Sequence, residues 1–118
     1  MHGFCHIELS TLDLEKAQKF YSELFGWQIM PLPGMEYMIF NAGEGAIGGG
    51  IMKVDKIVQQ DRVYSYVEVE DIEAILKKAE SLGGKTIQAK QVLPDASWGA
   101  TGVLETPCGY RLGLWAKA

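Results

Sequence analysis

The fold is decided by the segment His6–Trp27, which reads HIELSTLDLEKAQKFYSELFGW. Its pattern predicts a strand, then a helix, then the start of a second strand. The same order of patterns returns 58 positions further on, from Tyr64, where the sequence reads YSYVEVEDIEAILKKAESLGG, and Asp13 then falls on Asp71. A repeat at a fixed spacing indicates one structural unit used twice, so we expect two copies of one module.

The first copy has signals for each of its elements. Residues 4–10 alternate between apolar and polar side chains, which predicts a strand with Cys5 buried on its apolar side. A helix is expected over 13–25, because Asp13 can accept a backbone N–H of the first turn and Gly26 can end the helix in the left-handed conformation. The other expected strands of this copy are 27–30, 36–41 and 46–53.

Three consecutive glycines, Gly48-Gly49-Gly50, lie inside the expected strand 46–53. A phosphate-binding loop would be followed by a helix N-terminus or by a Gly-Lys-Ser/Thr motif, and neither is predicted here. We interpret the run as a place where the strand bends or passes close to another backbone.

The second copy follows a polar stretch, 54–62, which lacks periodicity and is expected to link the halves. It has an expected helix over 71–83 and expected strands over 63–69, 85–88, 100–105 and 111–116. Short sequential strands with one helix per half predict an α+β fold of two βαβββ modules, 1–53 and 63–118, within a single domain, 1–118. We expect the modules to form a curved, partly open barrel with one helix per module outside.

Composition excludes several classes of partner. At 118 residues the chain is long enough for one domain with its own core. A formal net charge of −4 without a basic run argues against nucleic acid and anionic membranes. No apolar run approaches the roughly 18 residues of a membrane-spanning helix, and the first residues do not resemble a signal peptide. With only Cys5 and Cys108 as cysteines, we expect reduced thiols and a cytoplasmic protein.

Several motifs resemble those of a known superfamily. They are Asp13-Leu14-Glu15-Lys16-Ala17 with Phe20-Tyr21 and Phe25-Gly26-Trp27, then Leu82-Gly83-Gly84, Thr106-Pro107-Cys108-Gly109 and Leu112-Gly113-Leu114-Trp115. The chain resembles the vicinal-oxygen-chelate superfamily, which holds glyoxalases, extradiol dioxygenases, fosfomycin-resistance enzymes and bleomycin-resistance proteins. Within it, the likeness is to small glyoxalase-related proteins of unassigned function. The motifs indicate the fold rather than the reaction, because this fold hosts many reactions.

The resemblance implies four metal-ligand positions, two in each module. The first-strand positions fall on His6 and Tyr64, and the last-strand positions fall on Gly49 and Gly113. Glycine has no side chain to coordinate a metal, and a neutral tyrosine is a poor ligand for a divalent ion. We therefore expect no metal, no other cofactor and no typical metal-dependent glyoxalase I activity. The alternative is a shifted divalent-metal site at His6 and Glu8, which project to the same side of one strand.

Strand alternation also collects polar and aromatic residues on one face, which we expect to be a concave small-molecule site. Its expected lining is Phe4, His6, Glu8, Tyr64, Tyr66, Glu68, Arg111 and Trp115, with Gly49 and Gly113 as its floor. His6 is the candidate general acid or base, oriented by Glu8 or Tyr66. Two other interpretations stay open: a histidine that is only a hydrogen-bonded wall residue, and aromatic filling with a Glu8–Arg111 ion pair.

Three functions remain open from the sequence. The preferred one is a metal-free protein of the glyoxalase/bleomycin-resistance type that binds a small planar or partly aromatic molecule. The second is a lyase or isomerase that works through His6 and a cavity carboxylate, or through an unexpected metal. The third is a structural partner whose pocket is residual. We also expect a C2 homodimer, because one small domain is not expected to bury Trp27, Phe40, Trp98 and Trp115 by itself.

Overall fold

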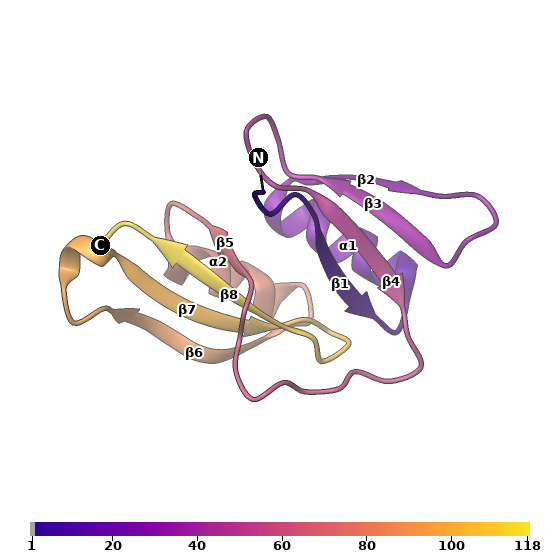
Figure 1. Cartoon of the computed structure of the whole chain (residues 1–118). Helices are drawn as coiled ribbons and strands as arrows, with labels where there is room; N and C mark the ends of the chain where they lie inside the picture. The colour runs from indigo at the N-terminus through magenta and orange to yellow at the C-terminus, as the bar shows by residue number, and fades with distance from the viewer. Residues whose placement is uncertain (1) are drawn as a thin grey trace. The chain divides into compact units, whose positions relative to one another are not determined.

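The computed structural model describes residues 2–118, which divide into two compact units on either side of the Ile57–Val58 bond (Figure 1). The first unit contains β1 (Ile7–Thr11), α1 (Leu14–Phe25), β2 (Gln28–Pro31), β3 (Tyr37–Asn41) and β4 (Gly49–Lys53). The second contains β5 (Tyr66–Glu68), α2 (Ile72–Ser81), β6 (Lys85–Val92), a 3-10 helix η1 (Ala96–Trp98), β7 (Ala100–Glu105) and β8 (Arg111–Ala116). Each unit is a βαβββ module, so the predicted α+β class is confirmed.

The two modules share one sheet topology. The strand orders are β1-β4-β3-β2 and β5-β8-β7-β6, and both four-stranded sheets are open. In each sheet the first and last strands pair in parallel, while the other neighbours pair antiparallel. The repeat seen in the sequence therefore extends to the pairing of the strands.

Both helices begin at the aspartates that the repeat aligned. The Asp13 carboxylate accepts the Lys16 N–H, and the Asp71 carboxylate accepts the Ala74 N–H, each at 3.0 Å. The helices end differently, because Gly26 takes the left-handed conformation at the end of α1, whereas α2 stops at Ser81 and Gly83 has the positive φ. Helix α2 is therefore shorter than the predicted span, 71–83.

Each helix buries its apolar stripe against one face of its own sheet (Figure 1). In the first module the Trp27 ring stacks on Tyr21 and on Phe40, with ring centroids 5.2 and 4.3 Å apart. In the second module Gly102 leaves room for Ile72, because a Cβ at Gly102 would lie 2.8 Å from its Cγ2 atom. Trp27 and Phe40 are therefore core residues of the first module, whereas Trp98 remains 60% exposed.

The first strand is shorter than predicted. It begins at Ile7, which pairs with Gly49 at the start of β4, so the residues before Ile7 have no strand to pair with. Phe4 is 95% exposed and Cys5 is exposed. The prediction that Cys5 is buried on the apolar side is therefore wrong, and Phe4 does not lie within the sheet face.

Within residues 2–118, neither helix has the length and apolar character needed to cross a bilayer.

Candidate functional site

Three side chains of the first module are joined by mutual hydrogen bonds. His6 Nε2 lies 3.0 Å from Glu8 Oε1 and 3.1 Å from the Tyr37 hydroxyl, and that hydroxyl donates to Glu8 Oε1 at 2.9 Å. His6 and Glu8 meet because residues two apart on an extended chain project to the same side. Tyr37 comes from β3, two strands away. Sequence reasoning placed Glu8 beside His6 but missed Tyr37.

Gly50 is the reason that Tyr37 can reach Glu8. It lies on β4, between β1 and β3, and pairs with Glu8 on one side and with Ile39 on the other. A Cβ atom at Gly50 would collide with the hydroxyl and ring of Tyr37. The signal in the sequence was the glycine run, together with a tyrosine at the start of the strand that pairs with it.

The environment keeps the Tyr37 hydroxyl protonated. Loss of surrounding solvent, the hydrogen bond to Glu8 and the negative charge of Glu8, in that order, raise the pKa of Tyr37 above its ordinary value of 10.0. Tyr37 is therefore a hydrogen-bond donor at neutral pH. The side chains of His6 and Glu8 are 45% and 50% exposed, so a molecule from solvent can reach them.

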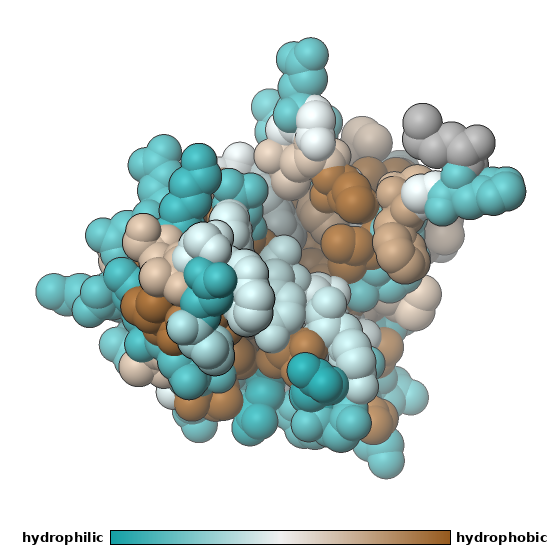
Figure 2. Space-filling view, turned by 60° about the vertical axis from the view of Figure 1, so that its left-hand side comes forward, coloured by the Kyte–Doolittle hydropathy of each residue, from teal (hydrophilic) through white to brown (hydrophobic). Residues whose placement is uncertain are grey.

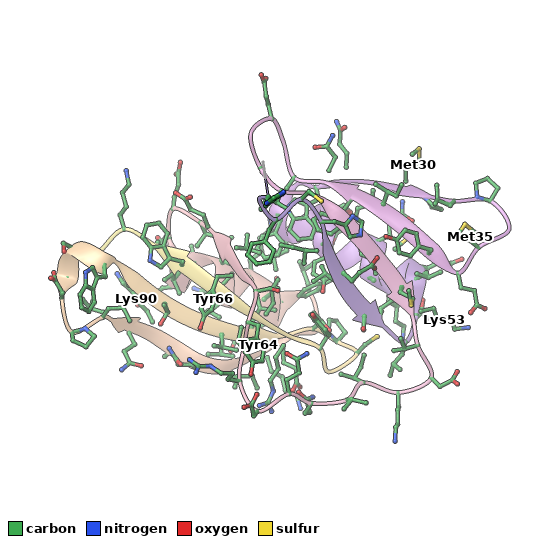
Figure 3. All side chains as sticks on the ribbon, viewed as in Figure 1. Met30, Met35, Lys53, Tyr64, Tyr66 and Lys90 are labelled. Carbon is green, nitrogen blue, oxygen red and sulfur yellow. The ribbon has the colours of Figure 1, made fainter. Side chains whose placement is uncertain are left out.

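The second module carries an exposed aromatic ring in the corresponding place. Tyr66 pairs with Gly113 across β5 and β8, and a Cβ atom at Gly113 would lie 2.5 Å from its ring. The Tyr66 ring therefore lies over Gly113, and Tyr66 remains 49% exposed (Figure 3). Alternation placed Tyr66, Gly113 and Trp115 on one face, and the strand register agrees with this.

Trp115 and Glu68 are cross-strand neighbours on the same face. The Trp115 indole N–H donates to the carbonyl of Trp98 at 2.8 Å, and its ring lies against Gly99. These contacts hold the Trp115 ring in a fixed orientation against the Trp98–Gly99 backbone, while Glu68 is exposed.

Arg111 and Tyr64 have local partners. Arg111 Nε lies 3.2 Å from Glu105 Oε1, its cross-strand neighbour on β7, so Arg111 has an ion-pair partner within its own module, and the Glu8–Arg111 ion pair considered from the sequence stays a prediction. The Tyr64 hydroxyl, which precedes β5, donates to Asp61 at 2.6 Å, and this hydrogen bond is the main cause that raises the pKa of Tyr64. His6 and Glu8 belong to one module and the remaining polar and aromatic candidates to the other, so a single site that uses both groups stays a prediction.

Gly49 does not form the floor of a site. A Cβ atom there would collide with the backbone of Ile7, which confirms that the glycine run marks a close approach of two backbones. The register pairs Gly50 with Glu8 in the same way that it pairs Gly113 with Tyr66. The counterpart of Gly113 is therefore Gly50, which corrects the assignment of Gly49.

The superfamily resemblance implies a divalent metal, and the last strand of each module would supply one of its ligands. Gly50 and Gly113 have no side-chain donor atom, and a tyrosine ring lies over each of them, so these two positions do not fit a metal ligand. Within residues 2–118, no three His, Cys, Asp or Glu side chains are grouped so that they could hold a metal ion.

Comparisons with known sequences agree with the fold. Residues 4–43 match the family model described as bleomycin resistance protein-like N-terminal. A glyoxylase-like domain-containing protein of Didymella fabae is 30% identical over 95 residues, which cover 74% of this chain and 73% of that protein. The putative glyoxylase CFP32 of Mycobacterium bovis is 29% identical over 115 residues. That match covers 92% of this chain and 43% of the mycobacterial protein, so the chain spans less than half the length of this relative.

Solved structures give the same result at the level of the fold. The fosfomycin resistance protein FosX of Listeria monocytogenes superposes with a TM-score of 0.79 at 15% identity, covering 100% of this chain and 95% of that one. A glyoxalase-related enzyme of Fulvimarina pelagi superposes with a TM-score of 0.72 at 17% identity, covering 98% and 88%. With its repeated βαβββ modules and its glyoxylase-like relative, the chain belongs to the glyoxalase/bleomycin-resistance family of the vicinal-oxygen-chelate superfamily.

Proposed function

We propose that this protein binds a small planar or partly aromatic molecule and does so without the divalent metal of the family's enzymes. The observation that carries the proposal is the Tyr66 ring, which lies over Gly113 while remaining 49% exposed. An aromatic ring held against a sheet offers a flat apolar surface on which another ring can stack.

The surroundings of Tyr66 support this role. Trp115 adds a second ring held by its own hydrogen bond, and Glu68, Arg111 and Tyr64 supply polar groups from the same module. Small-molecule sites combine apolar and aromatic walls with a few polar groups that orient the ligand. The family model that matches the chain is named for resistance to bleomycin, which is consistent with a binding role.

Ligand screening with fluorine-labelled tryptophan tests the proposal. The chain has three tryptophans, so 5-fluorotryptophan gives three resonances that separate Trp115 from Trp27 and Trp98. We expect ligands of a planar aromatic library to shift the Trp115 resonance, and the shift to disappear in Tyr66→Ala.

The matched control is Val92→Ala. Val92 is an exposed residue that pairs with Ala100, on the face of the same sheet opposite to Tyr66. Ligands should bind this variant as they bind the unchanged protein. Ligands that persist in Tyr66→Ala and shift only Trp27 would place the site elsewhere. A library without any ligand would favour a structural partner with a residual pocket.

The second candidate function is a lyase or isomerase that uses His6 and Glu8, with or without a divalent metal. The 3.0 Å separation of His6 Nε2 and Glu8 Oε1 favours it, because a carboxylate beside an imidazole stabilises the imidazolium formed by proton uptake. Thermal unfolding with Ni²⁺, Zn²⁺ or Fe²⁺ separates the metal-dependent form from the first proposal. A specific metal at 100 times its Kd would stabilise the fold by about 2.7 kcal/mol, and we expect no such saturable rise.

Metal analysis of the purified protein completes this test. Stoichiometric metal that is lost in His6→Ala would favour the enzyme over the binding protein. Turnover of the methylglyoxal–glutathione hemithioacetal would do the same. We also propose a cytoplasmic location, since the exposed thiol of Cys5 stays reduced there.

A further inference from the structure

The positions of the protons among His6, Glu8 and Tyr37 follow from their geometry. The Tyr37 hydroxyl has one proton, and it donates this proton to Glu8 Oε1 at 2.9 Å. His6 Nε2 lies 3.0 Å from the same carboxylate oxygen. A nitrogen without a proton would face that oxygen as a second acceptor, and the two would repel each other. Nε2 of His6 must therefore carry a proton.

The other ring nitrogen is then an acceptor. A neutral imidazole has one N–H and one nitrogen with a lone pair, so a proton on Nε2 leaves the lone pair on Nδ1. Among the described residues, no side chain or backbone group forms a hydrogen bond with Nδ1 of His6. The half-exposed His6 side chain can therefore present this lone pair to a bound molecule.

We infer that Tyr37 is a positioning residue: together with Glu8 it holds His6 in the Nε2-protonated tautomer, so that Nδ1 accepts a hydrogen bond from a hydroxyl of the ligand. The inference rests on the proposed function, the binding of a small molecule, and names the group that the first module would recognise, a phenolic or enolic O–H. Tyr37 acts through Glu8 Oε1, which accepts from the tyrosine on one side and from the imidazole on the other.

Gly50 provides a second way to disturb the same arrangement. Tyr37→Phe removes the hydroxyl, whereas Gly50→Ala keeps it but places a methyl group where the Tyr37 ring lies. Both changes take the hydroxyl away from Glu8 while the His6 and Glu8 side chains stay intact. If one variant fails to fold, the other still tests the inference.

Nitrogen NMR of histidine-labelled protein measures the tautomer directly. Long-range ¹H–¹⁵N correlation is recorded at an alkaline pH at which the ¹⁵N shifts of each ring show that it is neutral. His2, the other histidine, is exposed and reports the tautomer ratio of an unconstrained ring in the same spectrum. We expect His6 to be more strongly Nε2-protonated than His2. We expect the His6 ratio to move toward that of His2 by about fivefold in Tyr37→Phe and Gly50→Ala, because a Glu8 carboxylate without its bond to Tyr37 is no longer held against Nε2, and one ordinary hydrogen bond contributes about this factor.

The matched control is Tyr110→Phe. It removes the hydroxyl of a tyrosine that precedes β8 in the second module, and it should leave the His6 ratio unchanged. A backbone ¹H–¹⁵N spectrum of each variant shows whether the fold is intact. An Nδ1-protonated His6 in the unchanged protein would overturn the inference. So would an unchanged ratio in both Tyr37→Phe and Gly50→Ala.

Phenol and anisole test the acceptor role of Nδ1, because anisole has the same ring but carries a methyl group in place of the hydroxyl proton and cannot donate a hydrogen bond. We expect phenol to shift the Nδ1 resonance of His6 and anisole to leave it in place. Equal shifts, or no shift with phenol, would overturn the acceptor role. These outcomes do not depend on the fluorine screen, in which loss of binding in Tyr66→Ala tests the aromatic surface separately.

Discussion

Single glycines make room for different groups in the two sheets. Gly49 lies where a Cβ atom would meet the Ile7 backbone, whereas at Gly50 and Gly113 it would meet the rings of Tyr37 and Tyr66. A side-chain ring can rotate away, but a backbone can move only if β1 separates from β4. The cost of adding a methyl group should therefore differ among these positions.

We predict that Gly50→Ala and Gly113→Ala each lower the free energy of unfolding by about 1–3 kcal/mol, as overpacking commonly does. Gly49→Ala should cost more than either of them. Urea unfolding measures this as a fall in the midpoint at constant slope. Gly3→Ala is the control, because no atom lies within 4 Å of its Cβ position, and it should stay within about 0.5 kcal/mol. A Gly49→Ala variant as stable as the control would contradict the backbone contact.

The raised pKa of Tyr37 predicts a pH dependence with a definite sign. The folded state holds the phenol proton more tightly than the unfolded chain does. This contribution to stability is complete below the ordinary pKa of about 10 and is lost as the pH rises through the folded pKa. As the pH rises above about 10, the Tyr37→Phe variant should therefore lose less stability than the unchanged protein does.

Glu8 causes part of this shift and not all of it. Glu8→Gln removes the charged acceptor and leaves the burial of the hydroxyl, which is the larger cause. The pKa of Tyr37 should therefore move toward 10.0 in Glu8→Gln without reaching it. Tyrosinate absorbance, taken as the difference between each protein and its Tyr37→Phe variant, follows this one group. An unchanged titration would argue against the Tyr37–Glu8 hydrogen bond.

At the scale of the secondary-structure elements, the helix starts are the features that the two modules share most closely. Asp13 and Asp71 each accept the N–H of the third residue that follows, at 3.0 Å. Each aspartate also places a negative charge at the positive end of a helix dipole.

We predict that Asp13→Ala and Asp71→Ala each cost about 1 kcal/mol, within the usual range of about 0.5–2 kcal/mol for a lost N-cap. The two losses should be similar, because the caps have the same geometry. Asp55→Ala removes an exposed aspartate from the segment between the modules and should change stability little. A loss at one cap only would show that the two helix starts are not equivalent.

At the scale of the whole molecule, exposed apolar side chains bear on assembly. Figure 2 shows hydrophobic surface interspersed with hydrophilic surface. Among the large hydrophobic side chains that remain accessible is Trp98, which is 60% exposed. Clusters of exposed apolar surface commonly mark protein contacts.

We keep the prediction of a C2 homodimer, the commonest closed assembly. Sedimentation equilibrium at micromolar concentration should give twice the mass of one chain. Trp98→Ser should weaken the association if Trp98 lies at the contact, and Val92→Ala serves as an exposed control on the same module. A species with the mass of one chain, independent of concentration, would contradict the dimer.

The sequence by itself determined the features that depend on neighbouring residues. Caps at Asp13 and Asp71, the repeat between the halves and strand alternation led to two βαβββ modules. The same local rules put His6 beside Glu8, because side chains two apart on an extended chain share a side. These predictions held because the forces that decide them act within a few residues.

Only the tertiary structure decided the features that depend on strand pairing. It showed that Gly50 rather than Gly49 lies opposite Glu8, and that the Tyr37 side chain passes over β4 to reach Glu8. The physical reason is that cross-strand register is set by hydrogen bonds between segments far apart in the chain. A shift of one residue in that register moves every side chain to the other face of the sheet.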